Sequence, residues 1–464
     1  MGAKKPIRMN AFVMNTAGHQ SPGLWRHPRD RSGEYNRLDH WTSIARTLDE
    51  GLFDAMFMAD VFGVYDVYGG GPEAALTAGV QIPIGDPFVL VPAMAAVTEH
   101  LCFGVTGNIS HEAPLSFARR MTTLDHLTGG RVGWNIVTGY LDSASKGHGQ
   151  TRAAHDDRYA IAEDFTDVVY KLWEASWADD AACRDPDRGF TDPAGVARIH
   201  HDGPYFRLDA MGLGEPSPQR TPVLFQAGAS PRGRDFAARH AECVFVAGPS
   251  AQVIAPWVAD IRARAQAHGR APDDILVFAE ITVIPGATPA EAQAKHADYA
   301  RYIDRDGALA MVGGWTGVDF SDLGWDEPIA YQENDALRSH LEAITTADPD
   351  TVWTRRTLAD FAGIGGIGPV ITGDAPACAD ALEAFMEATD IDGFNLAYAV
   401  WPESFEDFTR LIVPELQARG RYRTRAATGT MREQLFGAGP RLAPPHPASQ
   451  AVSQAASKTR KTRS

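Results

Sequence analysis

Short apolar runs of strand length alternate with amphipathic segments along most of the chain, and this alternation limits the possible folds most strongly. Continuous apolar runs are typical of parallel strands that are buried on both faces. Eight such runs separated by helical segments predict a single α/β domain over residues 1–440, a closed (β/α)8 TIM barrel. A doubly wound open sheet is the alternative. The expected strands are Ile7–Met14, Phe53–Asp60, Leu101–Thr106, Val132–Thr138, Pro222–Gln226, Glu242–Ala247, Ile275–Ile284 and Gly393–Ala397.

Three connections are much longer than is usual between a strand and a helix, at about 61–86, 177–221 and 304–392. They follow the second, fourth and seventh expected strands. We therefore expect long insertions on the C-terminal face, where barrel enzymes build their active sites, as a lid over a deep, dry pocket. Val196–Leu208 predicts a hairpin in the middle connection. Gly363–Gly368 lacks the strand and helix of a dinucleotide loop, and we interpret it as a flexible lid segment.

Charge is unevenly distributed along the chain. The sequence has 464 residues and a net charge of −16, and residues 441–464 contain five basic residues and no acidic one. That tail of +5 leaves −21 for residues 1–440. An acidic body repels a phosphate backbone, so we expect no nucleic-acid partner. The tail is rich in Pro, Ala, Ser and Gln, and we predict that it is disordered, either solvated or in contact with an acidic partner.

Several absences favour a cytoplasmic protein without membrane contact. The sequence has no apolar run of about 18 residues, and its N-terminus lacks the apolar core of a signal peptide. The four cysteines form no CxxC pair, which fits a reducing compartment. His200-His201 has no partner at metal-ligand spacing, and HExxH does not occur, so we expect no metal site.

The segment Gln226–Arg234 is the most specific local motif. A strand ends, a glycine turn follows, and Ser230-Pro231 begins a helix, since serine is a good N-cap and proline a good first helical residue. Free N–H groups at a helix start, the serine hydroxyl and Arg232 would together form a phosphate cradle. An ordinary capped helix would use the same residues. A hydrolase nucleophile elbow is unsupported, because Arg232 stands where its second glycine should be.

Other polar residues stand at the expected barrel mouth. Asp60 ends the second strand and would either contact a ligand ring or cap the next turn. Asn135 and Thr138 lie on the fourth strand, where a buried amide needs a hydrogen bond either to a ligand or to a neighbouring strand. His155 and Tyr159 are one helical turn apart and would hold a phosphate or a ring, or have only a structural role.

Taken together, these stretches resemble the bacterial-luciferase-like superfamily of flavin-dependent monooxygenases. Within it the chain is similar to the nitrilotriacetate and dibenzothiophene-sulfone monooxygenase branch, and most similar to the long-chain alkane monooxygenase type. The resemblance covers about residues 7–437 in sequence order. The matching stretches are Met9–His19, Gly23–Pro28, Phe53–Tyr68, Met121–Thr138, His155–Tyr159, Glu215–Arg234, Asp392–Leu396 and Val413–Gly420.

The resemblance implies a barrel that binds reduced FMN non-covalently and uses O₂ as co-substrate. A separate NAD(P)H:FMN oxidoreductase would supply the reduced flavin, and a C4a-(hydro)peroxyflavin would insert one oxygen into a small, largely apolar organic substrate. The resemblance also implies a homodimer or homotetramer. The flavin contacts that it implies, together with the strand residues above, are Asp60, Thr106, Asn135, Thr138, Gly139, Tyr140, His155, Tyr159, Ala229, Ser230, Pro231 and Arg232.

His19, Tyr65 and Gln81 are retained and would act on the substrate side. The chain departs from the alkane type elsewhere. Thr16 replaces a cysteine, Gly139 replaces a serine, and the histidines expected near Tyr140 and Met311 are missing. These departures put an alkane substrate in doubt. The alternatives are a deazaflavin-dependent oxidoreductase, a non-catalytic flavin-binding protein and a metal-dependent barrel hydrolase.

Overall fold

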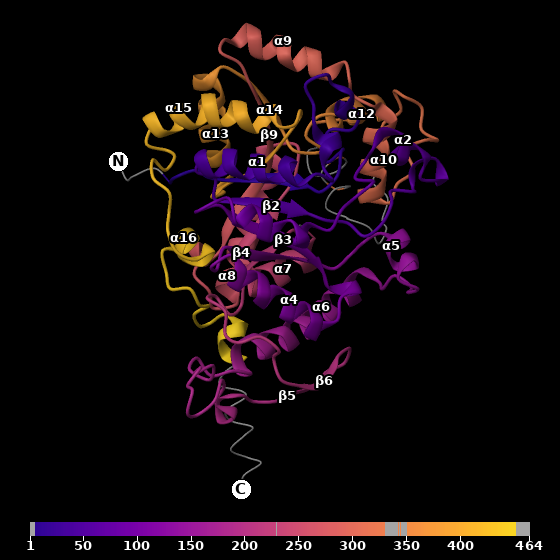
Figure 1. The fold of residues 1–464 in the computed structure, drawn as a ribbon. Helices are drawn as coiled ribbons and strands as arrows, with labels where there is room; N and C mark the ends of the chain where they lie inside the picture. Colours follow the sequence, from indigo (N-terminus) through magenta and orange to yellow (C-terminus); the bar gives the residue numbers. More distant parts are fainter. Residues whose placement is uncertain (1–4, 229, 330–341, 343, 345–349, 452–464) are drawn as a thin grey trace.

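Eight parallel strands close into a barrel in the computed structural model, which describes residues 5–228, 230–329, 342, 344 and 350–451 (Figure 1). Neighbouring strands pair in the order β9-β11-β1-β2-β3-β4-β7-β8, and β8 pairs back onto β9 from Cys243 opposite Leu276. This last pairing excludes an open sheet and confirms the TIM barrel. The barrel strands are β1 (Arg8–Met14), β2 (Ala55–Ala59), β3 (Cys102–Asn108), β4 (Val132–Val137), β7 (Val223–Gln226), β8 (Cys243–Val246), β9 (Leu276–Pro285) and β11 (Gly393–Ala397).

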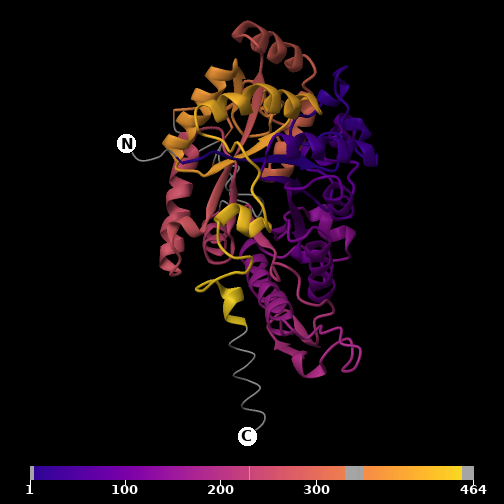
Figure 2. The same ribbon diagram turned by 60° about the vertical axis from the view of Figure 1, so that its left-hand side comes forward.

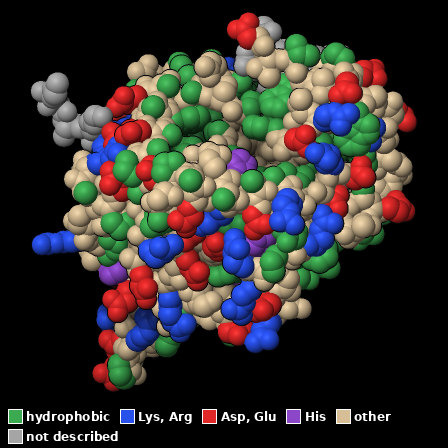
Figure 3. All heavy atoms as spheres, turned by 90° about the horizontal axis from the view of Figure 1, so that it is seen from above, with side chains coloured by type: hydrophobic (Ala, Val, Ile, Leu, Met, Phe, Trp, Pro, Cys, Tyr) green, Lys and Arg blue, Asp and Glu red, His purple; other side chains and the backbone are tan. Residues whose placement is uncertain are grey.

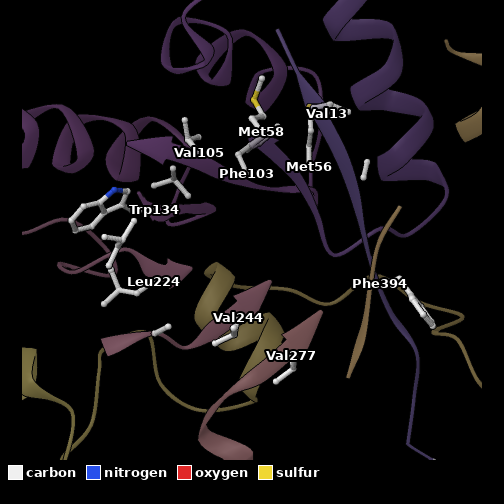
Figure 4. Close-up of a cluster of buried hydrophobic side chains, with 14 of the residues drawn as sticks. Val13, Met56, Met58, Phe103, Val105, Trp134, Leu224, Val244, Val277 and Phe394 are labelled. Atoms are coloured by element: carbon white, nitrogen blue, oxygen red, sulfur yellow. The ribbon is translucent and has the colours of Figure 1, made fainter. Parts of the chain in front are cut away.

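Alternate residues of each strand point outward and pack against a ring of helices. Figure 4 shows part of this outer layer, in which Met56, Met58, Val105, Trp134 and Val244 are buried. Helix α3 is a short member of the ring, with five residues. The ring helices are α1 (Leu38–Glu50), α3 (Val91–Ala95), α4 (Pro114–Leu127), α6 (His155–Tyr170), α7 (Pro231–His240), α8 (Ala251–Ala267), α13 (Ala375–Thr389), α14 (Glu403–Asp407) and α15 (Val413–Ala418).

Inward-facing side chains fill the barrel. Phe12, Phe57, Phe225 and Phe278 belong to one buried cluster inside it. The short helix α16 (Met431–Phe436) adds its own apolar side chains to this cluster, and it lies beside the N-terminal ends of the strands, where Met431 N donates to Gly130 O. One end of the barrel is therefore closed, and a ligand must enter at the other.

Two of the three insertions cover that other end. The connection after β2 contains α2 (Glu73–Ala78), and the connection after β9 contains α9 (Pro289–Ala300), α10 (Arg305–Thr316) and α12 (Arg355–Ala362). Helices α2 and α12 both pack on α10, at the opposite end of the barrel from α16 (Figure 1). They share an apolar cluster with residues that follow β2 and β4. This lid agrees with the expectation from the sequence.

The insertion after β9 is shorter than the expected 304–392. Residues 375–389 form α13, which packs against α8 and α15 and so takes a place in the outer ring. The extra strand β10 (Val370–Gly373) pairs in parallel with the end of β9. The run Gly363–Gly368 is not a flexible lid segment: residues 363–367 are buried, and Gly366 N donates to Gln20 O. The insertion proper therefore ends at this packed loop.

The middle connection is placed differently from the expectation. It follows α6 rather than a strand, so it begins near the N-terminal ends of the strands and not at the C-terminal face. It does contain the expected hairpin, with β5 (Ile199–Asp202) antiparallel to β6 (Arg207–Ala210). His201 Nε2 lies 2.8 Å from Asp164 Oδ1 and anchors the hairpin to the side of α6. Figure 2 shows this arm beside the last described residues.

The prediction of a disordered tail from residue 441 is wrong for the first part of that segment. His446 and Ala448 are buried, His446 Nε2 lies 2.7 Å from the His240 carbonyl oxygen, and Arg441 forms ion pairs with Glu174 and Asp179. Residues 441–451 are therefore part of the folded domain, because apolar and hydrogen-bonding partners on the barrel are available to them. Residues 452–464 lie outside the described residues, so the prediction of disorder is untested there.

The molecular surface carries mixed charge and a hollow with an apolar rim (Figure 3). On the face seen in Figure 3, Lys and Arg are interspersed with Asp and Glu, and hydrophobic side chains gather around a hollow. Within the described part of the chain, no helix has both the length and the apolar character to cross a membrane. Helix α5 (Asp142–Gly147) follows β4.

Candidate active site

A cavity opens at the C-terminal mouth of the barrel, beneath the lid. Its empty volume is about 890 Å³, part of which is open to solvent. Phe12, Phe57 and Phe245 form its aromatic floor, with ring centroids 4.9 to 5.8 Å apart. Its other lining residues are Met14, His19, Gln20, Ala59, Asp60, Tyr65, Gln81, Thr106, Asn135, Val137, Tyr140, Ala227, Ala247, Glu280 and Trp315.

Thr106 and Asn135 form a polar wall from the neighbouring strands β3 and β4. Asn135 Nδ2 donates to Thr106 Oγ1 at 2.8 Å, and Thr106 Oγ1 donates to Met58 O at 2.9 Å. The Asn135 amide thus ties two strands together, which is one of its two expected roles. Its Oδ1 atom is buried without a hydrogen-bond partner among the described residues. A buried acceptor of this kind indicates a missing donor from a ligand or water, so both expected roles of Asn135 remain available.

Asp60 lies beside this wall, where β2 ends. Its Oδ1 accepts from Val61 N at 2.9 Å, which caps the following turn. Burial, with a smaller contribution from the nearby Asp86 charge, raises the pKa of Asp60 to about 7. Asp60 also lines a second, neighbouring cavity between the insertion after β2 and α5. It therefore stands at a boundary between two cavities and is poised between its charged and neutral forms near neutral pH.

The three residues expected on the substrate side form one hydrogen-bonded network. Tyr65 Oη donates to Gln81 Oε1 at 2.7 Å, and Gln81 Nε2 donates to the His19 carbonyl oxygen at 2.9 Å. Tyr140 Oη lies 3.0 Å from Tyr65 Oη, and Trp315 Nε1 donates to Tyr65 Oη at 3.0 Å. Burial raises the pKa of Tyr65 to about 12, so its hydroxyl stays protonated. The network links the start of the chain, the insertion after β2 and α10.

His19 contributes its ring to the same cavity. The ring packs edge-on against Phe12 with centroids 4.4 Å apart. Burial lowers the pKa of His19 to about 3, so the imidazole is neutral at physiological pH. Its Nδ1 atom has no hydrogen-bond partner among the described residues. A neutral imidazole with a free ring nitrogen can orient a ligand or exchange a proton with it.

The predicted phosphate cradle has the expected local structure. Ser230 is the N-cap of α7, where its Oγ accepts from Gly233 N at 3.1 Å, and Pro231 is the first helical residue. A Cβ atom added at Gly228 or Gly233 would lie 2.8 or 2.6 Å from Tyr159 Oη, so these glycines let the phenol approach the turn. Burial raises the pKa of Tyr159, which therefore stays neutral. Ala229 lies outside the described residues.

The other predicted flavin contacts lie in several different places. Arg232 Nη1 lies 3.5 Å from Asp235 Oδ2 and is half exposed. His155 packs edge-on against Tyr159 at the start of α6, with ring centroids 5.5 Å apart. Thr138 and Gly139 do not line the active cavity but a third cavity, whose empty volume of about 1230 Å³ is partly open to solvent.

Two departures from the alkane type touch the substrate-side network. Tyr140 Oη lies 3.0 Å from Tyr65 Oη, and Met311 Sδ lies 3.9 Å from Gln81 Nε2, so the two places near which histidines are missing adjoin this network. Thr16 Oγ1 donates to Pro83 O at 2.7 Å and does not line the active cavity. Gly139 has a φ of +66°, a conformation that serine adopts at a cost.

Sequence reasoning missed three cavity residues whose side chains carry polar groups, Gln20, Glu280 and Trp315, besides the apolar lining. Glu280 carried a usable signal, because it is a carboxyl in the middle of an otherwise apolar strand. The sequence around Trp315 carries no such signal, because the position of this side chain depends on how α10 packs. In the described ranges no group of three or more His, Cys, Asp or Glu side chains could hold a metal ion.

The profile of the luciferase-like monooxygenase family matches residues 14–392. The chain is 48% identical to dimethyl-sulfide monooxygenase of Hyphomicrobium sulfonivorans, over 96% of this chain and 94% of that protein. It is 45% identical to long-chain alkane monooxygenase of Geobacillus thermodenitrificans, over 94% of this chain and 95% of that protein.

A solved riboflavin lyase structure with modified FMN and riboflavin is also similar. Its TM-score is 0.90 at 36% identity, over 96% of this chain and 99% of that chain. Structures of coenzyme F420-dependent enzymes are 14% identical and share the fold alone. Together with the barrel and its cavity, these findings show that the chain belongs to the family of luciferase-like monooxygenases and is a flavin-dependent oxidoreductase.

Proposed function

We propose that the chain is a two-component monooxygenase that takes reduced FMN from a separate NAD(P)H:FMN oxidoreductase. One oxygen atom of O₂ enters a small, neutral organic substrate and the other leaves as water, while the flavin gives up two electrons and leaves oxidised. Similar proteins support this proposal, including an FMNH₂-dependent dimethylsulfone monooxygenase of Pseudomonas fluorescens at 28% identity over 49% of this chain. A homodimer or homotetramer in the cytoplasm stays a prediction.

The observation that carries the proposal is the unpaired Asn135 Oδ1 in an apolar cavity. The ring edge of a flavin offers N–H donors, and Asn135 with Thr106 and Asp60 forms a polar wall of matching character. The N-cap turn at Ser230 and the two glycines beneath Tyr159 would hold the flavin phosphate. The residues present therefore fit FMN, which when bound supplies the electrons that activate O₂.

The chain's own residues prepare the site for that chemistry. Helix α10, whose Trp315 lines the cavity, and α2, which packs on α10, would limit the access of water to the reacting atoms. Tyr65 and Gln81 orient the substrate side and connect it to the His19 backbone. The aromatic floor provides apolar surface for the substrate.

The cavity lining also indicates the charge of the substrate. Among the described residues that line it there is no Lys or Arg, whereas Asp60 and Glu280 both contribute carboxyl groups. An anionic substrate would lose its hydration without gaining a counter-charge. We therefore propose a neutral substrate, such as an organic sulfide, a sulfone or a hydrocarbon, rather than an aminopolycarboxylate.

The test supplies reduced FMN from a reductase, with ¹⁸O₂, to a panel of organic sulfides, alkanes, aryl sulfones, aminopolycarboxylates and halogenated aromatics. We expect one labelled oxygen atom in the product of a neutral substrate and none from the aminopolycarboxylates. Turnover without oxygen would instead identify a deazaflavin-type hydride transfer. Tight flavin binding with no labelled product from any substrate would contradict the proposal and favour a flavin-binding protein.

A further inference from the structure

Glu280 is a buried acid in the active cavity to which the proposed chemistry assigns no role. It lies in the middle of β9, and its side chain faces the barrel interior on the same side as Phe278, because alternate strand residues share a face. It is 2% exposed and lines the cavity. Its Oε1 atom has no hydrogen-bond partner among the described residues, and no charged partner there shifts its pKa. An unpaired buried carboxyl costs stability, so its position indicates a role toward a ligand.

The packed loop Gly363–Gly368 backs this side of the cavity. A Cβ atom added at Gly368 would lie 2.7 Å from Glu280 Cγ, and one at Gly366 would lie 2.2 Å from Gln20 Oε1. Only glycine therefore lets the loop approach both side chains. Gln20 Oε1 is likewise buried without a partner among the described residues. The β9 side of the cavity thus presents unpaired polar atoms away from the Asn135 wall, with a backing that prevents them from turning outward.

Among the residues that the structure describes, no charged group compensates Glu280. The sequences of the neighbouring strands β8, β10 and β11 contain no charged residue. The titratable groups that share the cavity are His19, Asp60, Tyr65 and Tyr140, and none of them shifts the Glu280 pKa. Burial alone raises it to about 8, so the carboxyl carries its proton at neutral pH. A protonated carboxyl has an O–H group to donate.

We propose that Glu280 is a substrate-binding residue whose protonated carboxyl donates a hydrogen bond to an oxygen or sulfur acceptor of a neutral substrate. This inference rests on the proposed function for the identity of the cavity as the substrate site. The site then distinguishes ketones, sulfoxides and thioethers from hydrocarbons of the same shape. The discrimination arises because a hydrocarbon would leave the buried O–H without an acceptor.

The test measures binding of two probes of nearly equal shape, cyclopentanone and methylenecyclopentane, to the enzyme loaded with oxidised FMN. Ligand-observed NMR without reductant gives both affinities for the wild type and for Glu280→Gln, which keeps a donor, and Glu280→Leu, which does not. Thr282→Val is the matched control, since it removes an unpaired hydroxyl from the same face of β9 outside the cavity lining.

We expect the wild type, Glu280→Gln and Thr282→Val to bind the ketone about five- to tenfold more tightly than the alkene, the difference that one hydrogen bond supplies. Glu280→Leu should bind both equally. The wild-type preference should fall as pH rises above about 8, whereas that of Glu280→Gln should stay constant.

A ketone preference that survives in Glu280→Leu, or a pH dependence that persists in Glu280→Gln, would overturn the assignment. The experiment uses no turnover, so its outcome is independent of oxygen transfer. A preserved probe preference with no ¹⁸O incorporation would refute the proposed function alone. Incorporation of ¹⁸O together with a ketone preference that does not depend on Glu280 would refute the role of Glu280 alone.

Discussion

At the barrel mouth, the Tyr65 hydroxyl is the most highly connected of the candidate substrate-side groups, and we propose a role for it in turnover. The hydroxyl contacts Gln81, Tyr140 and Trp315 inside the cavity. Tyr65→Phe should lower kcat/KM about tenfold, because three buried polar groups lose a partner, while FMN affinity stays unchanged. Steady-state kinetics with a flavin titration checks this. Tyr68→Phe is the control, because it removes a hydroxyl from the same insertion outside the cavity. Equal losses in both variants would refute the role of Tyr65.

A substitution at Ser230 tests the predicted phosphate cradle separately from the rest of the proposed flavin site. Ser230→Ala should weaken FMN binding about tenfold and leave riboflavin binding unchanged, since riboflavin lacks the phosphate. Fluorescence titration with both flavins checks this. Thr288→Ala removes the equivalent N-cap of α9, far along the chain from the cradle. It should cost a similar ~1 kcal/mol of stability without changing either affinity. A matched loss of riboflavin affinity in Ser230→Ala would place the phosphate elsewhere.

Asp60 should make the stability of the flavin-free protein depend on pH. Its folded pKa of about 7 lies above the usual 3.8, so the folded protein binds more protons between these values and loses stability as pH rises through them. Asp60→Asn should therefore gain about 1–2 kcal/mol at pH 8 and nothing near pH 4.

Chemical unfolding at both pH values measures the effect of Asp60. Asp142→Asn is the control, because Lys146 lowers the pKa of Asp142 and its removal should give no gain at pH 8. An Asp60→Asn protein that is no more stable than the wild type at pH 8 would show that the Asp60 carboxyl is not penalised by burial.

At the scale of elements, α10 holds the substrate-side network in place. A Cβ atom added at Gly314 would lie 2.0 Å from the Tyr65 ring. Gly314→Ala should therefore displace Tyr65 and reduce turnover at least tenfold, although alanine favours the helix. Gly147→Ala, at the end of α5 with open space around it, should leave turnover unchanged. Assays of both variants beside their thermal stability check this, and full activity in Gly314→Ala would contradict it.

The elements also show how far the sequence could predict the fold. The eight strands were predictable because each is a continuous apolar run, and the Ser230 cap because its residues act locally. The positions of α9 and α13 in the fold were not predictable. Both are amphipathic helices, and only tertiary packing decides that α13 joins the ring.

Part of the candidate site was predictable from the sequence, and part was not. Tyr65 and Gln81 came from the resemblance and do meet in space. Trp315 and the buried Gly363–Gly368 loop escaped prediction because their positions depend on contacts between distant parts of the chain. Thr138 and Gly139 were assigned to the flavin but line a neighbouring cavity.

At the scale of the whole molecule, the last described segment completes the domain. Residues 441–451 bury His446 and Ala448 against the barrel and pair Arg441 with Glu174. A chain ending at residue 440 should be less stable than one ending at residue 451 by about 2–3 kcal/mol. Equilibrium unfolding of the two chains checks this, and equal stability would show that the segment only rests on the surface.

We propose that one flavin spans the cradle at Ser230 and the polar wall at Asn135. A crystal structure of the chain with FMN would show whether it does. The phosphate should lie within hydrogen-bond distance of Ser230 Oγ, and the ring edge against Asn135 Oδ1, with Tyr65 and Glu280 left facing the substrate space. A flavin bound instead in the cavity beside Thr138 and Gly139, or a phosphate away from Ser230, would contradict it.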